Sequence, residues 1–391
     1  MKTQTILLLP LALAGAAALL TQTTSAQTWQ TVDDFQFALG FDSVAQCIAK
    51  DPTGNLYSAG YSFNPTTVFA VINKSSDGGT NWSVIDDFTN GDPTNSGFEY
   101  YGITVDAAGR LYAVGDDFWS ANNDFQLGGW FVRESLDGGQ NWSTVDAFTL
   151  GGSSTAYGVG TDTAGNVYVV GSAYTANYGS GSWIVRKGTV NGSGAVSWAT
   201  VDKFAPGGGG SAAAVFCHPT AGIFVVGVAF GGGKKGTSQQ WYVRRSLNGG
   251  ATWANVDTYL GGSATGIGAD ALGHLYVVGT IASRYGSHWI VRKGTSGGTS
   301  WATVDDFSYG VPRAFSADAN GNLFVVGGAQ GRWTVRENPG GVGSWLTVDS
   351  FQYASGIQTE PYGTVADNSG QVFVAGYASP VGAAHWLVRK N

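Results

Sequence analysis

The sequence predicts an all-β fold, a seven-bladed β-propeller of four-stranded blades. Three observations lead to this fold class. One tryptophan-containing segment recurs seven times along the chain. The composition suits short strands joined by tight turns, with 61 Gly, 14 Trp, 17 Tyr and 20 Phe among 391 residues. The two ends of the chain carry complementary parts of one repeat, as a closed ring requires.

The recurring segment has the pattern W-x-x-V-D-x-F, with Ile or Tyr at some positions. Successive tryptophans lie 53, 60, 56, 55, 48 and 44 residues apart, close to the roughly 40 to 50 residues of one propeller blade. The segments begin at Trp29, Trp82, Trp142, Trp198, Trp253, Trp301 and Trp345.

Three more strand-like stretches separate successive copies, and the second unit shows them most clearly. Residues 101–109 alternate in polarity and end in a turn, residues 110–115 form an apolar run closed by Gly, and residues 129–135 lead into the sequence DGG. Near-continuous Val, Ile and Phe in the corresponding runs of other units is typical of strands buried on both faces, as packing between blades demands.

The number of copies predicts how the ring closes. The first three strands occur seven times, starting near Ala45, Tyr101, Tyr157, Ala212, Ala264, Arg313 and Tyr362. The first tryptophan segment precedes every such set, whereas the last unit ends without one. We therefore expect residues 29–35 to be the fourth strand of the blade formed by residues 362–391, which leaves no open sheet edge.

Residues 1–26 resemble a secretory signal peptide. Lys2 is followed by an apolar run from Ile6 to Leu20, and Thr24-Ser25-Ala26 supplies small residues before a cleavage site. A membrane anchor is the alternative, but this run is shorter than the roughly 20 apolar residues of a spanning helix. We expect cleavage near Ala26, a secreted or periplasmic product without membrane insertion, and a single propeller domain over residues 27–391.

The net charge bears on the expected binding partners, and the cysteine positions bear on whether a disulfide forms. The formal net charge is -7, so nucleic acid is not an expected partner. Cys47 and Cys217 fall at different offsets in different repeats, which favours two small buried residues over a disulfide. The sequence predicts a monomer that needs no cofactor.

The turns before several tryptophans read SSDGGTNW (residues 75–82), SLDGGQNW (135–142) and SLNGGATW (246–253). They resemble the Asp-box, or BNR repeat, of sialidase-like propellers. Stretches such as GITVDAAGRLYAVG resemble the bacterial SBBP propeller repeat. Asp-boxes lie away from the active face in sialidase-like folds, so the resemblance implies a structural role for Asp77, Asp137 and Asn248.

Charged residues that recur in the repeat units predict ion pairs within the fold. Six units carry an Arg in the third strand and all seven carry an Asp in the tryptophan segment, so we expect Arg-carboxylate pairs that brace the blades. Asn73 replaces Arg in the first unit, which makes Asp86 the expected unpaired member. The turns that begin at Asp51 and its counterparts lack the dense oxygen ligands of a calcium loop, and the four histidines are scattered. No metal site is predicted.

Function is sought where the repeat breaks, in the loops that share one face of a propeller. These loops combine aromatic rings with carboxylates, which suits a glycan or a peptide at the channel mouth. Three arginines outside the repeat are expected on the same face. The predicted ligand-binding residues are Phe118, Trp119, Tyr174, Tyr178, Asp116, Arg284, Arg313 and Arg332. The competing interpretation is that long loops simply vary.

Three function classes remain open from the sequence. The favoured one is a non-catalytic binding propeller for a glycan, a peptide or an envelope component. The second is a sialidase-like glycoside hydrolase or lyase, with Glu99, Glu360 and Asp117 as candidate acid or base groups. The third is a scaffold. If Glu99, Glu360 and the three non-repeat arginines surround one pocket, an enzyme is favoured, because acid and base carboxylates act about 5 to 9.5 Å apart.

Overall fold

The structure is a computed structural model. It describes residues 28–89, 96–121, 124–125, 128–175, 181–192, 194–231, 238–284, 286–367 and 369–391. The predicted signal peptide lies outside these residues. Within them, the chain is built of β-strands and two short 3-10 turns, η1 (Pro206–Gly208) and η2 (Pro339–Gly341). The described part holds no helix long and apolar enough to cross a bilayer.

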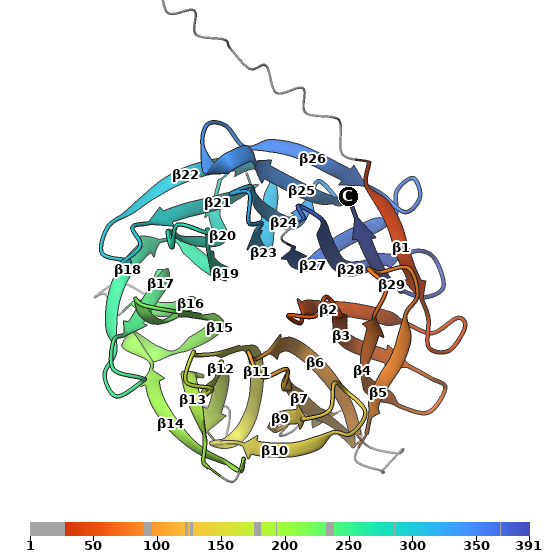
Figure 1. The fold of residues 1–391 in the computed structure, drawn as a ribbon, viewed down its shortest axis with the longest axis horizontal. Coiled ribbons are helices and arrows are strands. Elements are labelled where there is room, and N and C mark those ends of the chain that lie inside the picture. Colours follow the sequence, from red (N-terminus) through yellow and green to blue (C-terminus); the bar gives the residue numbers. More distant parts are fainter. Residues whose placement is uncertain are drawn as a thin grey trace, which may run out of the picture.

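The strands form four-stranded antiparallel blades arranged around a central axis (Figure 1). The first blade contains β2 (Ser43–Lys50), β3 (Leu56–Phe63), β4 (Val68–Ser75) and β5 (Ser83–Phe88). The second contains β6 (Ser96–Val105), β7 (Leu111–Ala121), β9 (Trp130–Ser135) and β10 (Ser143–Phe148), with the short β8 (Asp124–Phe125) paired to β7. The third contains β11 (Gly151–Thr161), β12 (Val167–Thr175), β13 (Ser182–Val190) and β14 (Val196–Phe204).

The remaining blades follow the same order. The fourth contains β15 (Gly210–His218), β16 (Gly222–Gly231), β17 (Ser238–Ser246) and β18 (Ala254–Leu260). The fifth contains β19 (Gly262–Ala269), β20 (Leu275–Ser283), β21 (Gly286–Gly294) and β22 (Trp301–Ser308). The sixth contains β23 (Gly310–Ala317), β24 (Leu323–Ala329), β25 (Arg332–Asn338) and β26 (Leu346–Phe351). The last contains β27 (Gln358–Ala366), β28 (Val372–Ser379), β29 (His385–Lys390) and β1 (Gln30–Phe35).

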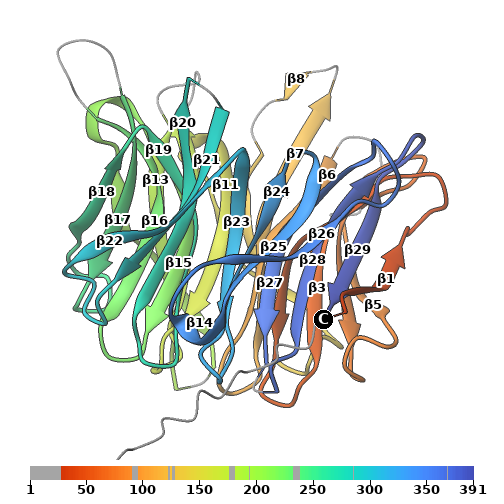
Figure 2. The ribbon, with the colours of Figure 1, turned by 90° about the horizontal axis from the view of Figure 1, so that it is seen from above.

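The first two blades belong to one hydrogen-bonded sheet, because β4 and β6 form a single parallel pair between Val68 and Gly97. They are otherwise separate four-stranded units like the other five. In each blade the first strand lies nearest the axis and the tryptophan-segment strand lies outermost (Figure 1). Seen from the side, the strands of all blades run between the same two faces of the ring (Figure 2).

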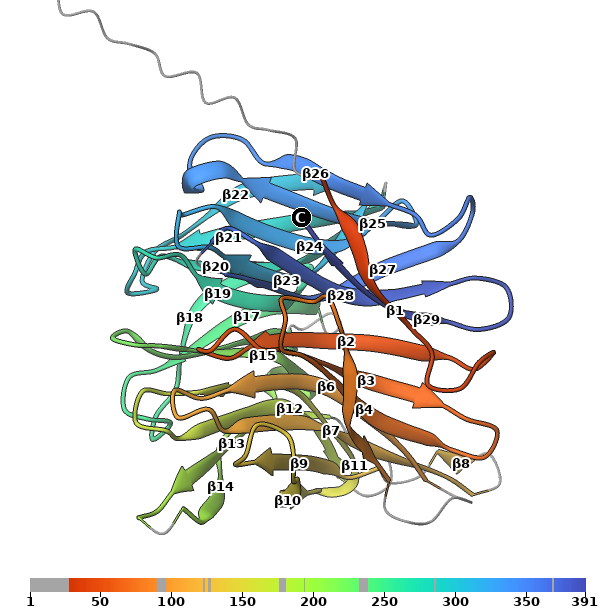
Figure 3. The same ribbon diagram turned by 45° about the vertical axis from the view of Figure 1, so that its right-hand side comes forward.

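The ring closes as the sequence predicts. Strand β1, at the start of the described chain, pairs antiparallel with β29 at its end, with Gln30 opposite Lys390 and Phe35 opposite Trp386. The two strands lie side by side in two views (Figures 1 and 3). The last blade therefore combines both ends of the chain. The predicted all-β propeller fold is confirmed.

The core lies between neighbouring blades. Six tryptophans of the third strands are completely buried, namely Trp130, Trp183, Trp241, Trp289, Trp333 and Trp386. Most of them pack on a glycine in the second strand of the next blade. A Cβ at Gly327, for example, would lie 2.1 Å from the Val311 carbonyl oxygen and 2.9 Å from the Trp289 ring. Glycine is therefore required at the end of each apolar run, because the neighbouring strand and, in most blades, the Trp of the preceding blade leave no room for a Cβ.

Arg-Asp pairs brace the ring, but they join neighbouring blades. Each third-strand Arg binds the Asp on the outer strand of the preceding blade, as in Arg292 Nε to Asp257 Oδ2 at 2.6 Å. The other pairs are Arg133–Asp86, Arg186–Asp146, Arg244–Asp202, Arg336–Asp305 and Arg389–Asp349. The expectation that Asp86 is the unpaired member is wrong. The blade that precedes Asn73 around the ring is the last one, so Asp33 lacks the partner.

The repeated Asp side chains of the turns bind their own turn. Oδ1 of Asp77 accepts hydrogen bonds from the backbone N–H groups of Thr80 and Asn81, and Asp137 does the same in the next blade. Oδ1 of Asp51 accepts from the N–H groups of Thr53 and Asn55 in the turn between β2 and β3. These oxygens satisfy turn donors that strands leave unpaired.

Candidate functional site

Each innermost strand carries a β-bulge at the same position. The bulge leaves one residue without a partner on the second strand, and a bulge turns that side chain away from the regular alternation. In the described strands these residues are Gln46, Tyr101, Tyr157, Ala213, Thr265, Arg313 and Tyr362. They differ from blade to blade, although the strands around them repeat.

The bulge residues line a cavity of about 250 Å³ on the propeller axis, together with the two residues that follow each of them. Tyr101 and Tyr157 are in edge-to-face contact, with ring centroids 5.5 Å apart. The guanidinium carbon of Arg313 lies 4.9 Å from the ring centroid of Tyr362. The channel is therefore lined mainly by small and apolar residues, with three tyrosines and one arginine gathered on two sides.

Two carboxylates meet beside this channel in the second blade. Glu99 of β6 and Asp116 of β7 are opposite residues of the antiparallel pair. The Tyr101 hydroxyl donates to Glu99 Oε2 at 2.7 Å, and the Thr155 hydroxyl donates to Asp116 Oδ2 at 2.6 Å. Burial raises the pKa of Glu99, and burial together with the nearby Glu99 charge raises the pKa of Asp116 to about 7.

A second cluster joins the sixth and last blades. Arg313 Nε donates to Glu360 Oε1 at 2.8 Å across the interface between β23 and β27. The Tyr362 and Tyr377 rings stack beside this pair, with centroids 5.8 Å apart and planes 15° from parallel. Glu360 is thus paired with a guanidinium that also faces the axial channel.

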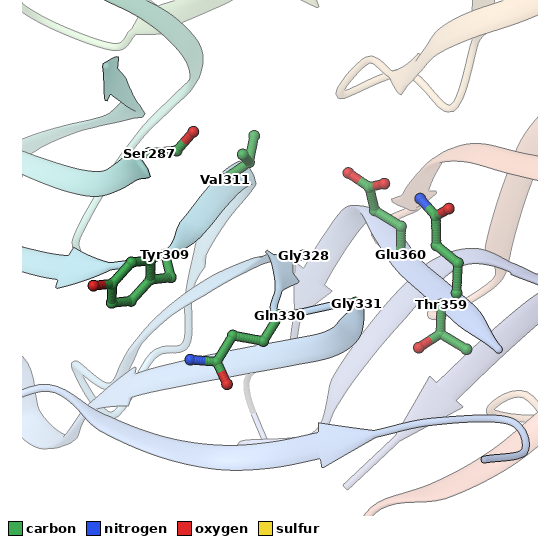
Figure 4. A pocket seen from close by; sticks show the side chains of 9 residues that line it. Ser287, Tyr309, Val311, Gly328, Gln330, Gly331, Thr359 and Glu360 are labelled. Atoms are coloured by element: carbon green, nitrogen blue, oxygen red, sulfur yellow. The ribbon is translucent and has the colours of Figure 1, made fainter. Parts of the chain in front are cut away.

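Glu360 also lines a pocket of about 360 Å³ at the same interface (Figure 4). Figure 4 shows Glu360 on one side of this pocket, with Val311, Tyr309 and Gln330 on the other. Ser287, Gly328, Gly331, Gln358 and Thr359 complete the lining. Apart from Glu360, the lining contains only uncharged groups, among them two amides, hydroxyls and one aromatic ring.

Two residues of this pocket have unusual backbones. Tyr309 has φ 64° and Gln330 has φ 54°, and they are the non-glycine residues with positive φ in the described chain. In the fifth blade the residue that corresponds to Tyr309 is Gly261, with φ 78°. A residue with a Cβ costs roughly 1 to 2 kcal/mol in this conformation, so both side chains are kept at the expense of stability.

The structure separates the residues predicted to bind a ligand. Arg313 and Glu360 meet in one cluster, whereas Glu99 and Asp116 form another. Arg332 donates to the Ser350 carbonyl oxygen within its own blade.

Several predicted residues lie elsewhere. Arg284 lies in the turn between β20 and β21, outside the linings of both cavities. Asp117 lines a different cavity. Tyr174 is 39% exposed near the end of β12. The three non-repeat arginines and the two glutamates therefore do not surround one pocket among the described residues.

The structure leaves parts of the prediction undescribed. Tyr178 lies outside the described residues. Only the backbone of Phe118 and Trp119 is described, in β7 opposite Gly97 and Ser96. Tyr309, Gln330 and most of the bulge residues are not predicted as site residues from the sequence. One signal was present, because a Tyr stands before Gly310 where the fifth repeat has Gly261.

No protein-family model matches the chain, and no curated protein sequence matches it. Solved structures resemble its fold. The polysaccharide lyase Uly1 has a TM-score of 0.53 and 11% identity over 89% of this chain and 90% of the lyase. YCF48 bound to D1 peptide has a TM-score of 0.52 and 12% identity over 91% of this chain and 94% of YCF48.

The Trypanosoma rangeli sialidase in complex with the inhibitor DANA has a TM-score of 0.50 and 10% identity, over 76% of this chain and 55% of the sialidase. Identities this low show a common fold and no more. The predicted likeness to sialidase-like propellers is therefore confirmed for the fold, and membership of the Asp-box or SBBP repeats stays a prediction. Propellers of this shape include enzymes as well as a peptide-bound protein.

Proposed function

We propose that the protein is a non-catalytic binding propeller that recognises a carbohydrate in the pocket between the sixth and last blades. The observation that carries this proposal is the backbone strain at Tyr309 and Gln330. Both residues keep a positive φ that glycine adopts without cost, and both side chains line the same pocket. Strained residues of this kind cluster at active sites and ligand-binding sites.

The pocket has the chemistry of a sugar site. Its volume of about 360 Å³ lies within the roughly 300 to 1,000 Å³ of small-molecule sites. The Tyr309 ring is 55% exposed at the rim and offers a surface on which a pyranose can stack. Gln330, Gln358 and Glu360 supply hydrogen-bond donors and acceptors for hydroxyl groups.

The charges favour an uncharged sugar. Glu360 is the charged residue of the lining, and Arg313 neutralises it from the channel side. Two further carboxylates, Glu99 and Asp116, lie beside the axial channel in the second blade, and the whole chain has a net charge of -7. An anionic sugar such as a uronate or a sialic acid would meet this negative potential, and the described pocket lining contains no guanidinium to bind its carboxylate.

The geometry also argues against Glu360 as a catalytic acid. Glu360 Oε1 already accepts hydrogen bonds from the Arg313 guanidinium, so this oxygen serves as an acceptor and not as a proton donor to a substrate. The pocket lining offers no second carboxylate for a base role.

The decisive variant is Tyr309→Gly. It removes the ring and relieves the positive φ, so binding should fall while the melting temperature stays equal or rises. Purified protein would be screened on a glycan array, and hits would be measured by isothermal titration calorimetry. Leu272→Ala, at an exposed turn outside the pocket lining, is the control and should bind as the native protein does. Unchanged affinity of Tyr309→Gly would refute the site.

A glycoside hydrolase or lyase remains the second candidate because of Glu99 and Asp116. These carboxylates face each other and burial raises the pKa of both, so one can stay protonated as an acid while its neighbour is ionised. Turnover of polysaccharides by the native protein, abolished in Asp116→Asn and in Glu99→Gln, would support this function. Binding without turnover would leave the first proposal standing.

We also propose that residues 1–26 are a cleaved signal peptide and that the exported product is a monomer that binds no nucleic acid. Mass spectrometry of the exported protein should find an N-terminus at Gln27. Light scattering should report a mass of one chain. An N-terminus at residue 1 would contradict the export proposal.

A further inference from the structure

The interface between the first and second blades departs from the repeat at three positions. The first departure is Ala70 in β4. Ala70 pairs with Phe88, the last aromatic residue of the outer strand. In the other six blades a fully buried Trp pairs with that aromatic residue, as Trp130 does with Phe148. The first blade therefore lacks the Trp that the other blades bury at this position.

The second departure is Phe98 in β6. The corresponding residues of the other innermost strands are small or medium-sized, namely Ser43, Ser154, Gly210, Gly262, Gly310 and Thr359. Phe98 occupies the region that the missing Trp leaves, with its ring centroid 4.8 Å from Phe88 and 5.8 Å from Phe131. Phe88 and Phe131 are themselves 5.4 Å apart. Packing explains this aromatic cluster.

The third departure, Asp117 in β7, has no packing explanation. Asp117 is directly opposite Phe98. In the other blades this position holds uncharged residues, namely Ser62, Ala173, Ala229, Ile281, Ala329 and Ala378. Burial raises the pKa of Asp117, so the carboxylate is unfavourable in the free protein. A charged side chain at a position that is uncharged in every other blade points to a ligand.

These residues surround a cavity of about 300 Å³, separate from the axial channel and from the Tyr309 pocket. Asp117, Phe88, Phe98, Phe131 and Phe148 belong to its lining, together with Trp130, Gly129, Thr144, Ala147 and Thr149. Thr144, Ala147 and Thr149 are exposed, so the cavity opens to solvent beside β10. None of the lining residues is Lys or Arg.

The orientation of the carboxylate is fixed within this cavity. Asp117 Oδ1 accepts a hydrogen bond from the Gly129 N–H, and the Asp117 N–H donates to the Gly129 carbonyl oxygen at 3.0 Å. On one side of the aromatic cluster the Arg133 guanidinium carbon lies 3.8 Å from the Phe88 ring centroid, a contact that the repeat also forms between other blades, as Arg244 does with Phe204. Aromatic rings and a carboxylate together attract a cation with an apolar surface.

We infer that the cavity between the first and second blades binds a small organic cation, an alkylated or quaternary ammonium group, through Asp117 and the surrounding aromatic rings. The apolar methyl groups of such a cation contact the phenylalanines and its positive charge faces the carboxylate. A metal ion or an inorganic cation does not fit, because one carboxylate among hydrocarbon walls offers too few oxygen ligands. This site is independent of the proposed carbohydrate pocket.

The test compares choline with 3,3-dimethylbutan-1-ol, its uncharged isostere, by isothermal titration calorimetry on the full mature chain. Choline should bind saturably, and the isostere should bind at least tenfold more weakly. Asp117→Asn keeps an acceptor for the Gly129 N–H and should weaken choline binding by tenfold or more. Asp87→Asn removes an exposed carboxylate next to Phe88 and should leave choline binding unchanged.

Phe98→Leu gives a second readout that does not involve charge. It should weaken choline more than it weakens the isostere, because a leucine keeps apolar contact but has no π face. The melting temperature of each variant is measured first to ensure that the fold is retained. Equal affinity for choline and the isostere, full choline affinity in Asp117→Asn, or no saturable choline binding to the native protein would each overturn the inference.

Discussion

The Asp33 carboxylate at the ring closure should make the stability of the protein depend on pH. Asp33 lies on β1, in the blade formed by both chain ends, and its place in the repeat is that of the six Asp residues that bind Arg. The residue in the Arg position is Asn73, which is 1% exposed and whose side-chain amide atoms have no hydrogen-bond partner. Asp33 Oδ2 is likewise buried without a partner.

The size and sign of the effect follow from the pKa. Burial, with a smaller contribution from the neighbouring Asp34, raises the pKa of Asp33 from 3.8 to about 7. The folded protein therefore binds a proton more tightly than the unfolded chain does. The stabilising contribution is fully present below pH 3.8 and is lost as pH rises through about 7. The shift corresponds to at most about 4 kcal/mol.

Asp33→Asn should remove this dependence. The free energy of unfolding of the native protein and of the variant would be measured by chemical denaturation from pH 4 to pH 9. The difference should turn increasingly in favour of the variant between pH 4 and pH 7 and then level off. A difference that stays constant across this range would refute the reasoning, because it would mean that Asp33 titrates alike in the folded and unfolded states.

A second variant rebuilds the missing pair. In five blades the Arg also binds a Thr or Asn of its own outer strand, as Arg292 Nη1 binds the Thr303 hydroxyl at 3.2 Å. In the first blade that outer-strand position is Val84, opposite Asn73. The double variant Asn73→Arg/Val84→Thr should hold Asp33 ionised and raise stability above pH 7. In this double variant the free energy of unfolding should also vary less with pH than it does in the native protein.

The remaining predictions concern packing and reactivity. Arg292→Ala leaves a buried carboxylate unpaired and should lower the free energy of unfolding by about 3 to 5 kcal/mol in denaturation experiments. Gly327→Ala should prevent folding or cause a severe loss of melting temperature, because the new Cβ meets a carbonyl oxygen at 2.1 Å, whereas Gly328→Ala, with its nearest atom at 3.5 Å, should be tolerated. Cys47 and Cys217 should resist iodoacetamide at pH 8 in the folded protein, because burial raises the pKa of both thiols, and fast labelling would contradict this.

The sequence by itself determined the fold and the closure of the ring. A blade is one repeat, its strands are adjacent in sequence, and its hydrophobic runs are a local property of the chain. Residues 29–35 were assigned to the last blade because the chain ends are complementary, and the pairing of β1 with β29 confirms this. Glu99 and Glu360 occupy matching places in their units, each two residues before the bulge residue.

Only the tertiary structure decided which residues meet across blades. The sequence showed six Arg and seven Asp residues, but the partner of each Arg lies on the preceding blade, so the unpaired carboxylate is Asp33 and not Asp86. This register depends on the packing angle between blades, which no local pattern encodes. The channel residues escaped notice for a similar reason, because a bulge shifts one residue without leaving a composition signal.

The candidate pockets also depend on contacts between blades. Tyr309 and Gln330 are ordinary residues in the sequence, and their strain appears only in the backbone angles of two separate turns that border one pocket. The sequence predicts Asp117 only as a candidate acid or base group, because its aromatic surroundings come from two blades. A repeat determines how each blade folds, whereas the binding surfaces form where unlike side chains of neighbouring blades come together, and that depends on the closed ring.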